Sequence, residues 1–152
     1  MPRRIYVVGS LKEPGVPHVA AALRAEGHYV FDDWHGAGPQ ADRYWQEYEQ
    51  RRGRTYIEAL HAPAAQHNFQ FDKKWLDWAD TAVLVMPAGK SGHMEGMEVQ
   101  KHGEFHVLFP GEEPESWDLM YLLADGVHLG LDTLLPALRL PTAPAFVMRV
   151  RP

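Results

Sequence analysis

The sequence predicts an α/β fold in which a parallel β-sheet is covered by helices on both sides. Short apolar runs typical of strands alternate along the chain with longer segments of helical character, the pattern of parallel strands joined by helices. The run TAVLVMP at residues 81–87 shows no polar–apolar alternation, which indicates a strand buried on both faces. The 152 residues suffice for one compact domain and are too few for two ordinary ones.

The first elements form a strand–helix–strand unit. Residues 4–9, RIYVVG, are a β-branched and aromatic run that stops at a glycine, which predicts a buried strand. A helix follows and stops at Gly27, and its apolar face consists of Val16, Val19, Ala20 and Leu23. Residues 29–34, YVFDDW, are predicted as a second strand that ends in two carboxylates and an indole.

The next segment, residues 40–79, is helical in character and rich in aromatic residues. We expect its tryptophan and tyrosine side chains to lie mostly in the core, with one or two available to stack on a flat base. The strand at 81–87 precedes a helix from about residue 92 to residue 101, a strand at 105–110, and a helix–strand–helix segment at 119–140. The Pro-rich tail, residues 141–152, has no clear place in the sheet.

Composition restricts the possible functions and partners. A chain with 45% hydrophobic and 23% charged residues is typical of a globular protein, and no apolar run approaches the roughly 20 residues that cross a bilayer. The first apolar run is too short for a signal peptide, so we expect a cytoplasmic protein without a membrane partner. The absence of cysteine excludes disulfides, thiolate metal ligands and a cysteine nucleophile. A net charge of −5 argues against a nucleic-acid partner, and the basic run at residues 51–54 is expected to be a solvated helix face.

Three predicted strand ends carry residues that could line a ligand site. In an open parallel sheet, ligands bind beyond the carboxyl ends of the strands, near the point where the strand order reverses. The residues at these ends are Gly9 and Ser10, then Asp32, Asp33 and Trp34, then the turn at 89–95. Asp32 and Asp33 could hold ribose hydroxyls or cap the segment that follows them, and both alternatives stay open.

The turn after the third strand contains Gly89, Lys90 and Ser91, which suggests a phosphate loop. That motif needs a glycine five positions before the Gly-Lys pair so that the backbone can wrap around the phosphates, and Leu84 occupies this position. The sequence therefore argues against a nucleotide triphosphatase. A helix N-terminus at this turn, with the Ser91 hydroxyl, could still hold a phosphate or a sugar hydroxyl.

Two carboxylates are candidates for chemistry. Glu95 is expected in the first turn of the helix after the third strand, where the helix dipole favours the ionised form that suits a nucleophile; an ordinary first-turn acid is the alternative. Asp72 is expected near the start of the helix that leads into the third strand, where it could also be a helix cap. Two carboxylates facing one cleft can share the work of breaking a glycosidic bond, because one attacks the anomeric carbon and the other handles the leaving group's proton.

Glu98, His102 and His106 are four residues apart, a spacing that suits metal ligands on a helix. We expect no metal site here, because Gly103 should end the helix and His106 falls in the next strand. A metal-dependent hydrolase that uses Glu98 and His102 is kept as an alternative.

Together these motifs resemble the nucleoside 2-deoxyribosyltransferase superfamily, which includes the 2'-deoxynucleoside 5'-monophosphate N-glycosidases. The matching features are IYVVGS at the first strand, Asp72 eight residues before Asp80, and the glycine turn SGHMEGM, in the family's order over residues 4–135. The resemblance implies a flavodoxin-like three-layer sandwich with a five-stranded parallel sheet. It also implies an enzyme that cleaves or transfers the N-glycosidic bond of a nucleoside or nucleotide, without a cofactor.

The resemblance further implies roles for individual residues. Glu95 would be the nucleophile that forms a glycosyl ester at C1', Asp72 would protonate or orient the leaving base, and Tyr6 would position Glu95. The positions expected around the substrate, from the strand ends and the resemblance together, are Gly9, Ser10, Asp32, Asp33, Trp34, Ser91, Gly92 and Met94. Family members commonly complete the active site across a subunit boundary, which implies a homo-oligomer, a dimer or larger, with Met120 and Tyr121 as candidates at that boundary.

The chain departs from the family pattern at Gly89. The transferases carry an acidic residue six positions before the nucleophile and the monophosphate hydrolases carry a serine, whereas Ser91 lies only four positions before Glu95. This departure leaves the substrate and the acceptor open. It also admits an alternative function, a non-catalytic domain of the same fold that binds a nucleotide or another ribosyl ligand.

Overall fold

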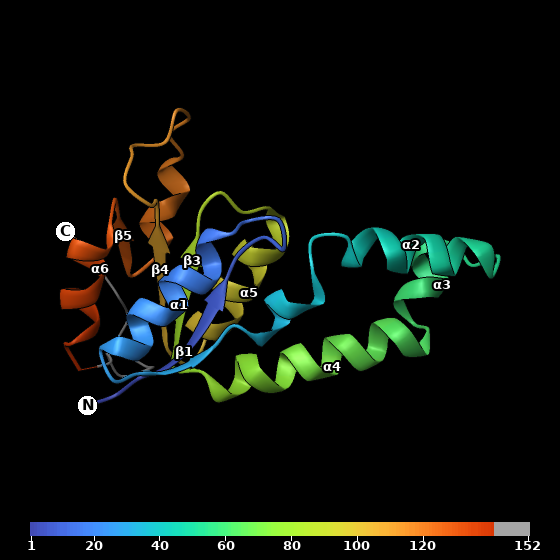
Figure 1. Cartoon of the computed structure of the whole chain (residues 1–152), viewed down its shortest axis with the longest axis horizontal. Helices are drawn as coiled ribbons and strands as arrows, with labels where there is room; N and C mark the ends of the chain where they lie inside the picture. The colour runs from blue at the N-terminus through green and yellow to red at the C-terminus, as the bar shows by residue number, and fades with distance from the viewer. Residues whose placement is uncertain (142–152) are drawn as a thin grey trace.

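The structure is a computed structural model that describes residues 1–141, and its centre is a five-stranded, all-parallel sheet between two layers of helices (Figure 1). The strand order is β2-β1-β3-β4-β5. The strands are β1 (Arg4–Val8), β2 (Tyr29–Phe31), β3 (Thr81–Val85), β4 (Glu104–Leu108) and β5 (Gly126–His128). This arrangement confirms the predicted α/β class and is consistent with a flavodoxin-like three-layer sandwich. Residues 142–152, most of the Pro-rich tail, lie outside the described residues.

Helices cover both faces of the sheet. The α-helices are α1 (Gly15–Ala25), α2 (Ala41–Arg51), α3 (Tyr56–Leu60), α4 (Pro63–Trp78), α5 (Lys90–Gln100) and α6 (Leu131–Leu138), and the 3-10 helices are η1 (Asp33–Ala37) and η2 (Leu119–Leu123). One core cluster joins the sheet to α1 and α6, and the other joins the opposite face to α4 and α5. Among residues 1–141, no helix is both long and apolar enough to cross a bilayer.

The strand order reverses next to β1. Strand β2 pairs with one edge of β1 and β3 pairs with the other, so Tyr6 on β1 lies between Phe31 and Ala82 of its neighbours. Tyr6 is completely buried on the face covered by α4 and α5. A ligand site is therefore expected at the carboxyl ends of β1 and β3.

Several element boundaries differ from those predicted. Strand β2 ends at Phe31, so Asp32 precedes η1 and does not belong to a strand. Helix α5 begins at Lys90, two residues earlier than expected. The segment before β5 is the short 3-10 helix η2 and not an α-helix. The predicted stop at Gly27 is confirmed, since this glycine adopts the left-handed φ of 91° that ends helices without steric cost.

The prediction that the aromatic residues of the segment 40–79 lie mostly in the core is wrong for its outer part. Helices α2 and α3 and the first half of α4 project away from the sheet, and we call this projection the helical arm (Figure 1). Only the end of α4 packs on the sheet, through Leu76 and its neighbours. The arm exposes large apolar side chains, namely Tyr44, Tyr48, Tyr56, Ile57 and Phe69. These residues have no core to enter because the arm lies beyond the edge of the sheet.

A buried row of polar side chains joins the sheet to α6. Arg3 donates to Glu104 at 2.7 Å and to the carbonyl oxygens of Leu138 and Leu140 at 2.8 and 2.7 Å, so it satisfies carbonyls at the C-terminal end of α6. His106 contacts the same Glu104 oxygen at 2.9 Å and reaches His128 at 3.1 Å. Buried charges are tolerable here because each has a charged or hydrogen-bonding partner.

Gly126 makes the contact between the two histidines possible. A Cβ atom at this position would lie 2.6 Å from a ring nitrogen of His106 and 2.6 Å from one of His128. The rings stack with their centroids 5.4 Å apart. Burial, together with the neighbouring His106, lowers the pKa of His128 to about 4. The fold therefore holds His128 in its neutral form at neutral pH.

Acid is expected to destabilise the protein through His128. In the folded state the pKa of His128 lies below the ordinary value of 6.5. Between about pH 6.5 and pH 4 this histidine is therefore protonated in the unfolded chain and neutral in the folded chain. The free energy of unfolding should fall by about 2 kcal/mol between pH 7 and pH 5 on this account. Replacement His128→Gln should flatten this dependence in urea unfolding measured across the range. An equally steep pH dependence in the variant would contradict the assignment.

Candidate active site

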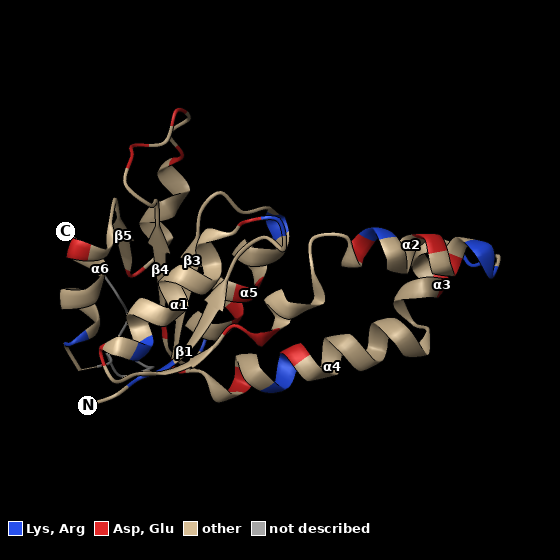
Figure 2. Cartoon of the chain, in the orientation of Figure 1, with Lys and Arg blue, Asp and Glu red and all other residues tan. Residues whose placement is uncertain are grey.

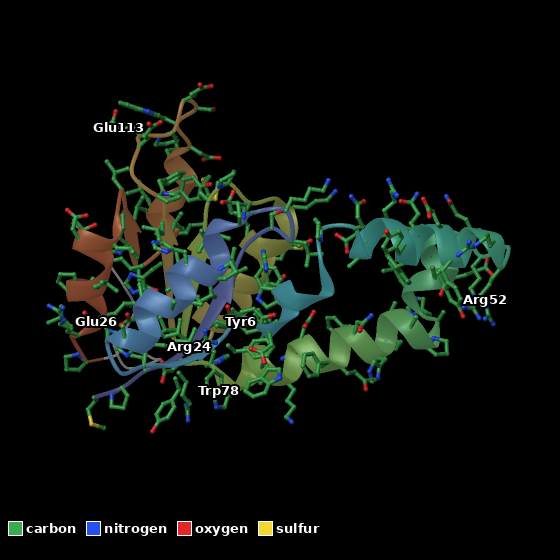
Figure 3. The ribbon with its side chains drawn as sticks, in the orientation of Figure 1. Tyr6, Arg24, Glu26, Arg52, Trp78 and Glu113 are labelled. Atoms are coloured by element: carbon green, nitrogen blue, oxygen red, sulfur yellow. The ribbon has the colours of Figure 1, made fainter. Side chains whose placement is uncertain are left out.

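Three residues from separate elements meet beside the point where the strand order reverses. Tyr6 lies on β1, Asp72 on α4 and Glu95 on α5, and the two carboxylates are close enough to influence each other and the phenol electrostatically. The structure thus brings together the three residues that the sequence singled out for catalysis. Figure 3 labels Tyr6 within the body of the molecule, away from the arm.

Two glycines explain why Glu95 lies so deep. A Cβ at Gly92 would lie 2.8 Å from Leu84 and 3.3 Å from Val8, and a Cβ at Gly96 would overlap the ring of Phe105. Both glycines are buried, so α5 rests directly on β1, β3 and β4. Glu95 lies between them in sequence, so the close approach of α5 to the sheet places Glu95 near Tyr6. Gly92 was expected to shape the pocket, and its observed role is this close helix–sheet contact.

The prediction that Glu95 lies in the first turn of its helix, where the helix dipole would favour the ionised form, is wrong. Because α5 begins at Lys90, Glu95 is in the second turn, and the first turn contains no acidic residue. Burial and, to a smaller extent, the negative charge of Asp72 raise the pKa of Glu95, the interaction with the Tyr6 hydroxyl lowers it, and the net result is a pKa of about 7. Burial also raises the pKa of Asp72. At neutral pH, Glu95 can therefore either accept or donate a proton.

Asp72 is not a helix cap. It lies well inside α4, which begins at Pro63 and ends at Trp78. Its carboxylate is close enough to Glu95 for its charge to raise the pKa of Glu95. Among residues 1–141, neither carboxylate forms an ion pair with lysine, arginine or histidine. Holding two negative charges close together, partly removed from water and without a neighbouring cation, costs free energy. Such unpaired carboxylates are common at functional sites.

Aromatic rings form the apolar wall of this site. Phe31 stacks on Trp75 with centroids 4.5 Å apart and lies 5.1 Å from the ring of Tyr6. Trp75 is one turn beyond Asp72 on α4. The Tyr6 hydroxyl is enclosed and makes no hydrogen bond of normal geometry, and burial raises the pKa of this phenol, followed by the charges of Glu95 and Asp72. Tyr6 therefore remains a neutral donor that faces the two carboxylates.

The residues after β1 are explained by packing and by a turn. A Cβ at Gly9 would lie 2.9 Å from Val16 and 3.3 Å from the Val85 carbonyl oxygen, so only glycine lets the chain leave β1 between α1 and β3. The Ser10 hydroxyl accepts from the backbone N–H of Lys12 at 3.1 Å and so shapes the turn. Both residues lie at the carboxyl end of β1, as predicted, and each has a structural role.

Of the two alternatives predicted for Asp32, the structure does not support the helix cap, and the contact with ribose hydroxyls stays a prediction. Asp32 precedes η1 but makes no capping hydrogen bond, and its carboxylate instead pairs with Arg24 at 2.6 Å. Asp33 is exposed. Trp34 donates from its indole to the Val7 carbonyl oxygen at 2.8 Å and packs against both cores, so it closes the carboxyl end of β1.

The remaining predicted positions divide into two groups. Ser91 and Met94 are exposed on α5, on either side of the buried Gly92. Met120 and Tyr121 belong to η2, which contacts α5 through His93 and not through Glu95. The Tyr121 hydroxyl lies 2.9 Å from His93, whose other ring nitrogen donates to the Gly89 carbonyl oxygen at 2.7 Å.

The three residues at metal-like spacing do not form one site. Glu98 pairs with Lys73 and Lys101, and His102 hydrogen-bonds to the Ala79 carbonyl oxygen. His106 lies on the other face of the sheet, in the row with Glu104 and His128. No three histidine or acidic residues of the described chain cluster as a metal site would require. The metal-dependent alternative built on Glu98 and His102 is therefore not supported by their arrangement.

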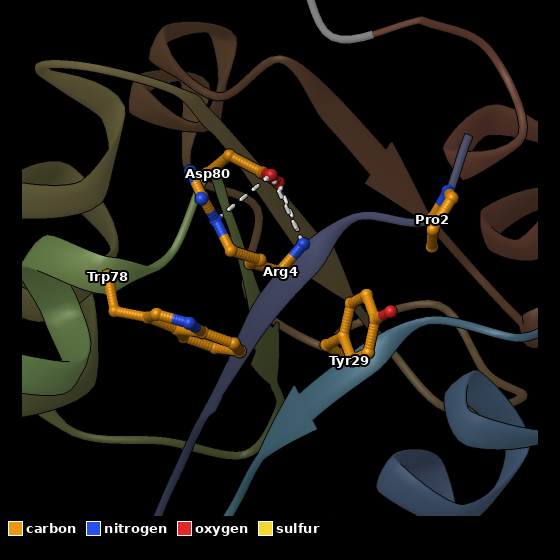
Figure 4. Close-up of a pocket in the computed structure, with 5 residues that line it drawn as sticks. All are labelled: Pro2, Arg4, Tyr29, Trp78 and Asp80. Atoms are coloured by element: carbon orange, nitrogen blue, oxygen red, sulfur yellow. Dashed lines mark hydrogen bonds and ion pairs between the residues drawn. The ribbon is translucent and has the colours of Figure 1, made fainter.

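A hollow of about 460 Å³ lies at the opposite edge of the sheet, where the strands begin (Figure 4). Arg4 lies across it between Trp78 and Tyr29, and its guanidinium is 3.7 Å from Asp80. Asp80 also accepts from the Arg4 backbone N–H at 3.1 and 3.2 Å. The Asp80 of the family pattern thus fixes the start of β1 and β3 and lies away from Glu95.

Sequence reasoning missed the contributions of Phe31, Trp75, Gly96 and His93. The spacing of Gly92 and Gly96 by four residues was an available signal, because small residues at this spacing form one face of a helix that can approach a sheet. The stack of Phe31 on Trp75 carried no such signal, since it joins residues more than forty positions apart.

Comparison with known protein families found no family model that matches this chain. Comparison with curated proteins likewise found no similar sequence.

Two substitutions should move the pKa of Glu95 in opposite directions. Asp72→Asn removes a negative charge and should lower it, whereas Tyr6→Phe removes the interaction with the phenol and should raise it. The titration can be followed through the side-chain carboxyl carbon by ¹³C NMR. Asp77→Asn, an exposed acid on the same helix as Asp72, is the matched control and should leave the pKa unchanged. Shifts of the same sign in both variants would refute the arrangement described for this site.

Proposed function

We propose that the protein cleaves or transfers the N-glycosidic bond of a nucleoside or nucleotide through a covalent glycosyl–Glu95 intermediate. The observation that carries this proposal is the partly buried pair of Glu95 and Asp72 beside Tyr6 of β1, next to the point where the strand order reverses. Breaking a glycosidic bond requires two acidic groups with different proton affinities facing one reacting carbon.

In the first step, a carboxylate oxygen of Glu95 bonds to C1' while the bond from C1' to the base nitrogen breaks. The base leaves with the electron pair of that bond and takes its proton from water, while the Asp72 carboxylate orients the base. In the second step, water or a second base adds to C1', the ester bond breaks and Glu95 leaves as a carboxylate. The proton released by the incoming water or base passes to the solvent, so the enzyme is regenerated.

The electrostatics of the site suit this reaction. The transition state has oxocarbenium character, so positive charge develops beside the carboxylates. A carboxylate removed from water stabilises that charge more strongly than a solvated one does. The raised pKa of Glu95 also makes its carboxylate more basic, at the expense of the fraction that is ionised at neutral pH.

The proposal extends to the setting of the enzyme. It includes no cofactor, a cytoplasmic location and a small-molecule nucleoside or nucleotide as the partner, as expected from the sequence. It also includes a homo-oligomer, a dimer or larger, in which the segment with Met120 and Tyr121 lies at a subunit boundary. The exposure of large apolar side chains on this segment supports self-association.

Loss of Glu95 should abolish base release. Ribo- and deoxyribonucleosides and their 5'-monophosphates are incubated with the wild type and with Glu95→Ala, and free base is measured together with intact-protein mass. We expect a loss of at least about 1,000-fold in the variant, and a sugar adduct on the wild type only. Glu98→Gln, which changes a half-buried acid on the same helix that pairs with Lys73 and Lys101, is the matched control and should retain activity. The wild-type kcat/KM should fall as the pH drops below about 7, because Glu95 becomes protonated.

The same experiment tests the alternative function. If neither the wild type nor Glu95→Ala releases base while both bind a member of the panel, glycosidic catalysis is rejected for these substrates. A non-catalytic domain that binds a ribosyl ligand would then be the better description.

A further inference from the structure

The surface around η2 exposes an unusual amount of apolar area. Trp117 is 80% exposed, Leu119 75% and Leu122 73%, and Val127 on the edge strand β5 is 47% exposed. Together with Asp118 and Tyr121 these residues line a hollow of about 530 Å³. Monomeric proteins rarely leave such a contiguous apolar surface open to water, so a partner is expected to cover it. We call this surface the η2 patch.

The rim of the η2 patch is acidic. The loop between β4 and η2 contains the exposed acids Glu112, Glu113, Glu115 and Asp118, and the sequence has no lysine or arginine between Lys101 and Arg139. The first three of these acids form no ion pair with any described residue. Figure 2 shows the acidic residues along this loop. A partner for the patch should therefore combine apolar side chains with positive charge.

The outer end of the helical arm has this combination. Arg54 pairs with Glu49 at 2.8 Å, which leaves Arg51 and Arg52 as basic side chains that form no ion pair with a described carboxylate. The Arg52 guanidinium lies over the ring of Tyr48 and donates to its hydroxyl at 2.7 Å. Figure 2 shows the arginines gathered at this end of the arm.

Exposed apolar side chains lie close to these arginines in sequence. They are Tyr48 on α2, and Tyr56 and Ile57 on α3, with exposed fractions of 43%, 67% and 62%. Tyrosine and arginine are the residue types that most often dominate binding at protein interfaces. The end of the arm is therefore opposite in charge to the rim of the η2 patch, and both surfaces expose apolar side chains.

We propose that the arm of one copy of this chain docks on the η2 patch of a second copy. Arg51 and Arg52 face the acidic loop, and Tyr56 and Ile57 cover the apolar side chains of η2. Within one copy the two surfaces lie far apart, since Arg52 is at the end of the arm and Glu113 is in the loop on the other side of the body (Figure 3). The contact must therefore form between copies.

A reciprocal exchange of arms gives a closed dimer. Each copy offers one arm and receives one, so the interface is related by a two-fold axis and leaves neither surface open. The inference rests on the self-association included in the proposed function, and it does not depend on the glycosidic chemistry.

Charge reversal on the two surfaces tests the contact. One variant is Arg51→Glu/Arg52→Glu and the other is Glu112→Lys/Glu113→Lys, and self-association is measured by analytical ultracentrifugation over a range of concentrations. Each variant alone should associate roughly 100-fold more weakly than the wild type, because like charges then face each other. Mixing the two variants should restore association as a heterodimer, because both arm–loop contacts are then complementary again.

Controls separate this contact from general effects of charge. Lys12→Glu/Lys90→Glu changes the net charge by the same amount as the arm variant, at exposed positions away from the arm, and should associate like the wild type. Circular dichroism and thermal melting check that every variant is folded.

Three results would overturn the proposal. A wild type that stays monomeric at all concentrations rejects self-association itself. A dimer that resists Arg51→Glu/Arg52→Glu shows that the copies associate through another surface. Two weakened variants that fail to restore each other show that the arm and the acidic loop are not partners. Because base release is measured separately, none of these results decides the proposed chemistry.

Discussion

The close contact of α5 with the sheet is the constraint on which the candidate site depends. Gly92 and Gly96 remove the side chains that would hold this helix away from Leu84 and Phe105. The helix therefore lies low enough to place Glu95 beside Tyr6, in surroundings poor in water. A larger residue at either glycine would lift the helix, return water to Glu95 and separate the carboxylate from the phenol.

Charged side chains are compensated on one face of the sheet and uncompensated on the other. On the face covered by α1 and α6, Arg3 neutralises Glu104 and the two histidines continue the hydrogen-bonded row. On the other face, Glu95 and Asp72 lie close enough to influence each other electrostatically, and Tyr6 beside them is a neutral phenol. The first arrangement stabilises the fold. The second leaves like charges uncompensated, which is a stability cost that a bound substrate with developing positive charge would relieve.

The described chain also leaves two surfaces without cover, the helical arm and the η2 patch. Both expose large apolar side chains, yet they differ in charge, since one is basic and the other acidic. An arm whose core contact with the body is made by the end of α4 gains little stability from that body. Its extension is easier to understand when a second copy supplies the contacts that the first one lacks.

Local patterns in the sequence determined the class of fold and the order of its elements. The apolar run at residues 81–87 and the glycine stop at Gly27 depend on neighbouring residues, so they could be predicted without coordinates. The choice of Tyr6, Asp72 and Glu95 came from motifs in a family order, and the structure places these residues together.

The environment of those residues could not be predicted in the same way. The first-turn position of Glu95 was wrong, the alternative cap at Asp72 is not formed, and the aromatic residues in the outer part of the segment 40–79 are exposed. A helix start and a projecting arm depend on packing with distant segments. The sequence by itself determined which side chains are the candidates for the proposed chemistry. Only the tertiary structure decided that Glu95 is partly buried near Asp72 with a pKa of about 7, because loss of water and charge proximity arise when β1, α4 and α5, which are far apart along the chain, come together.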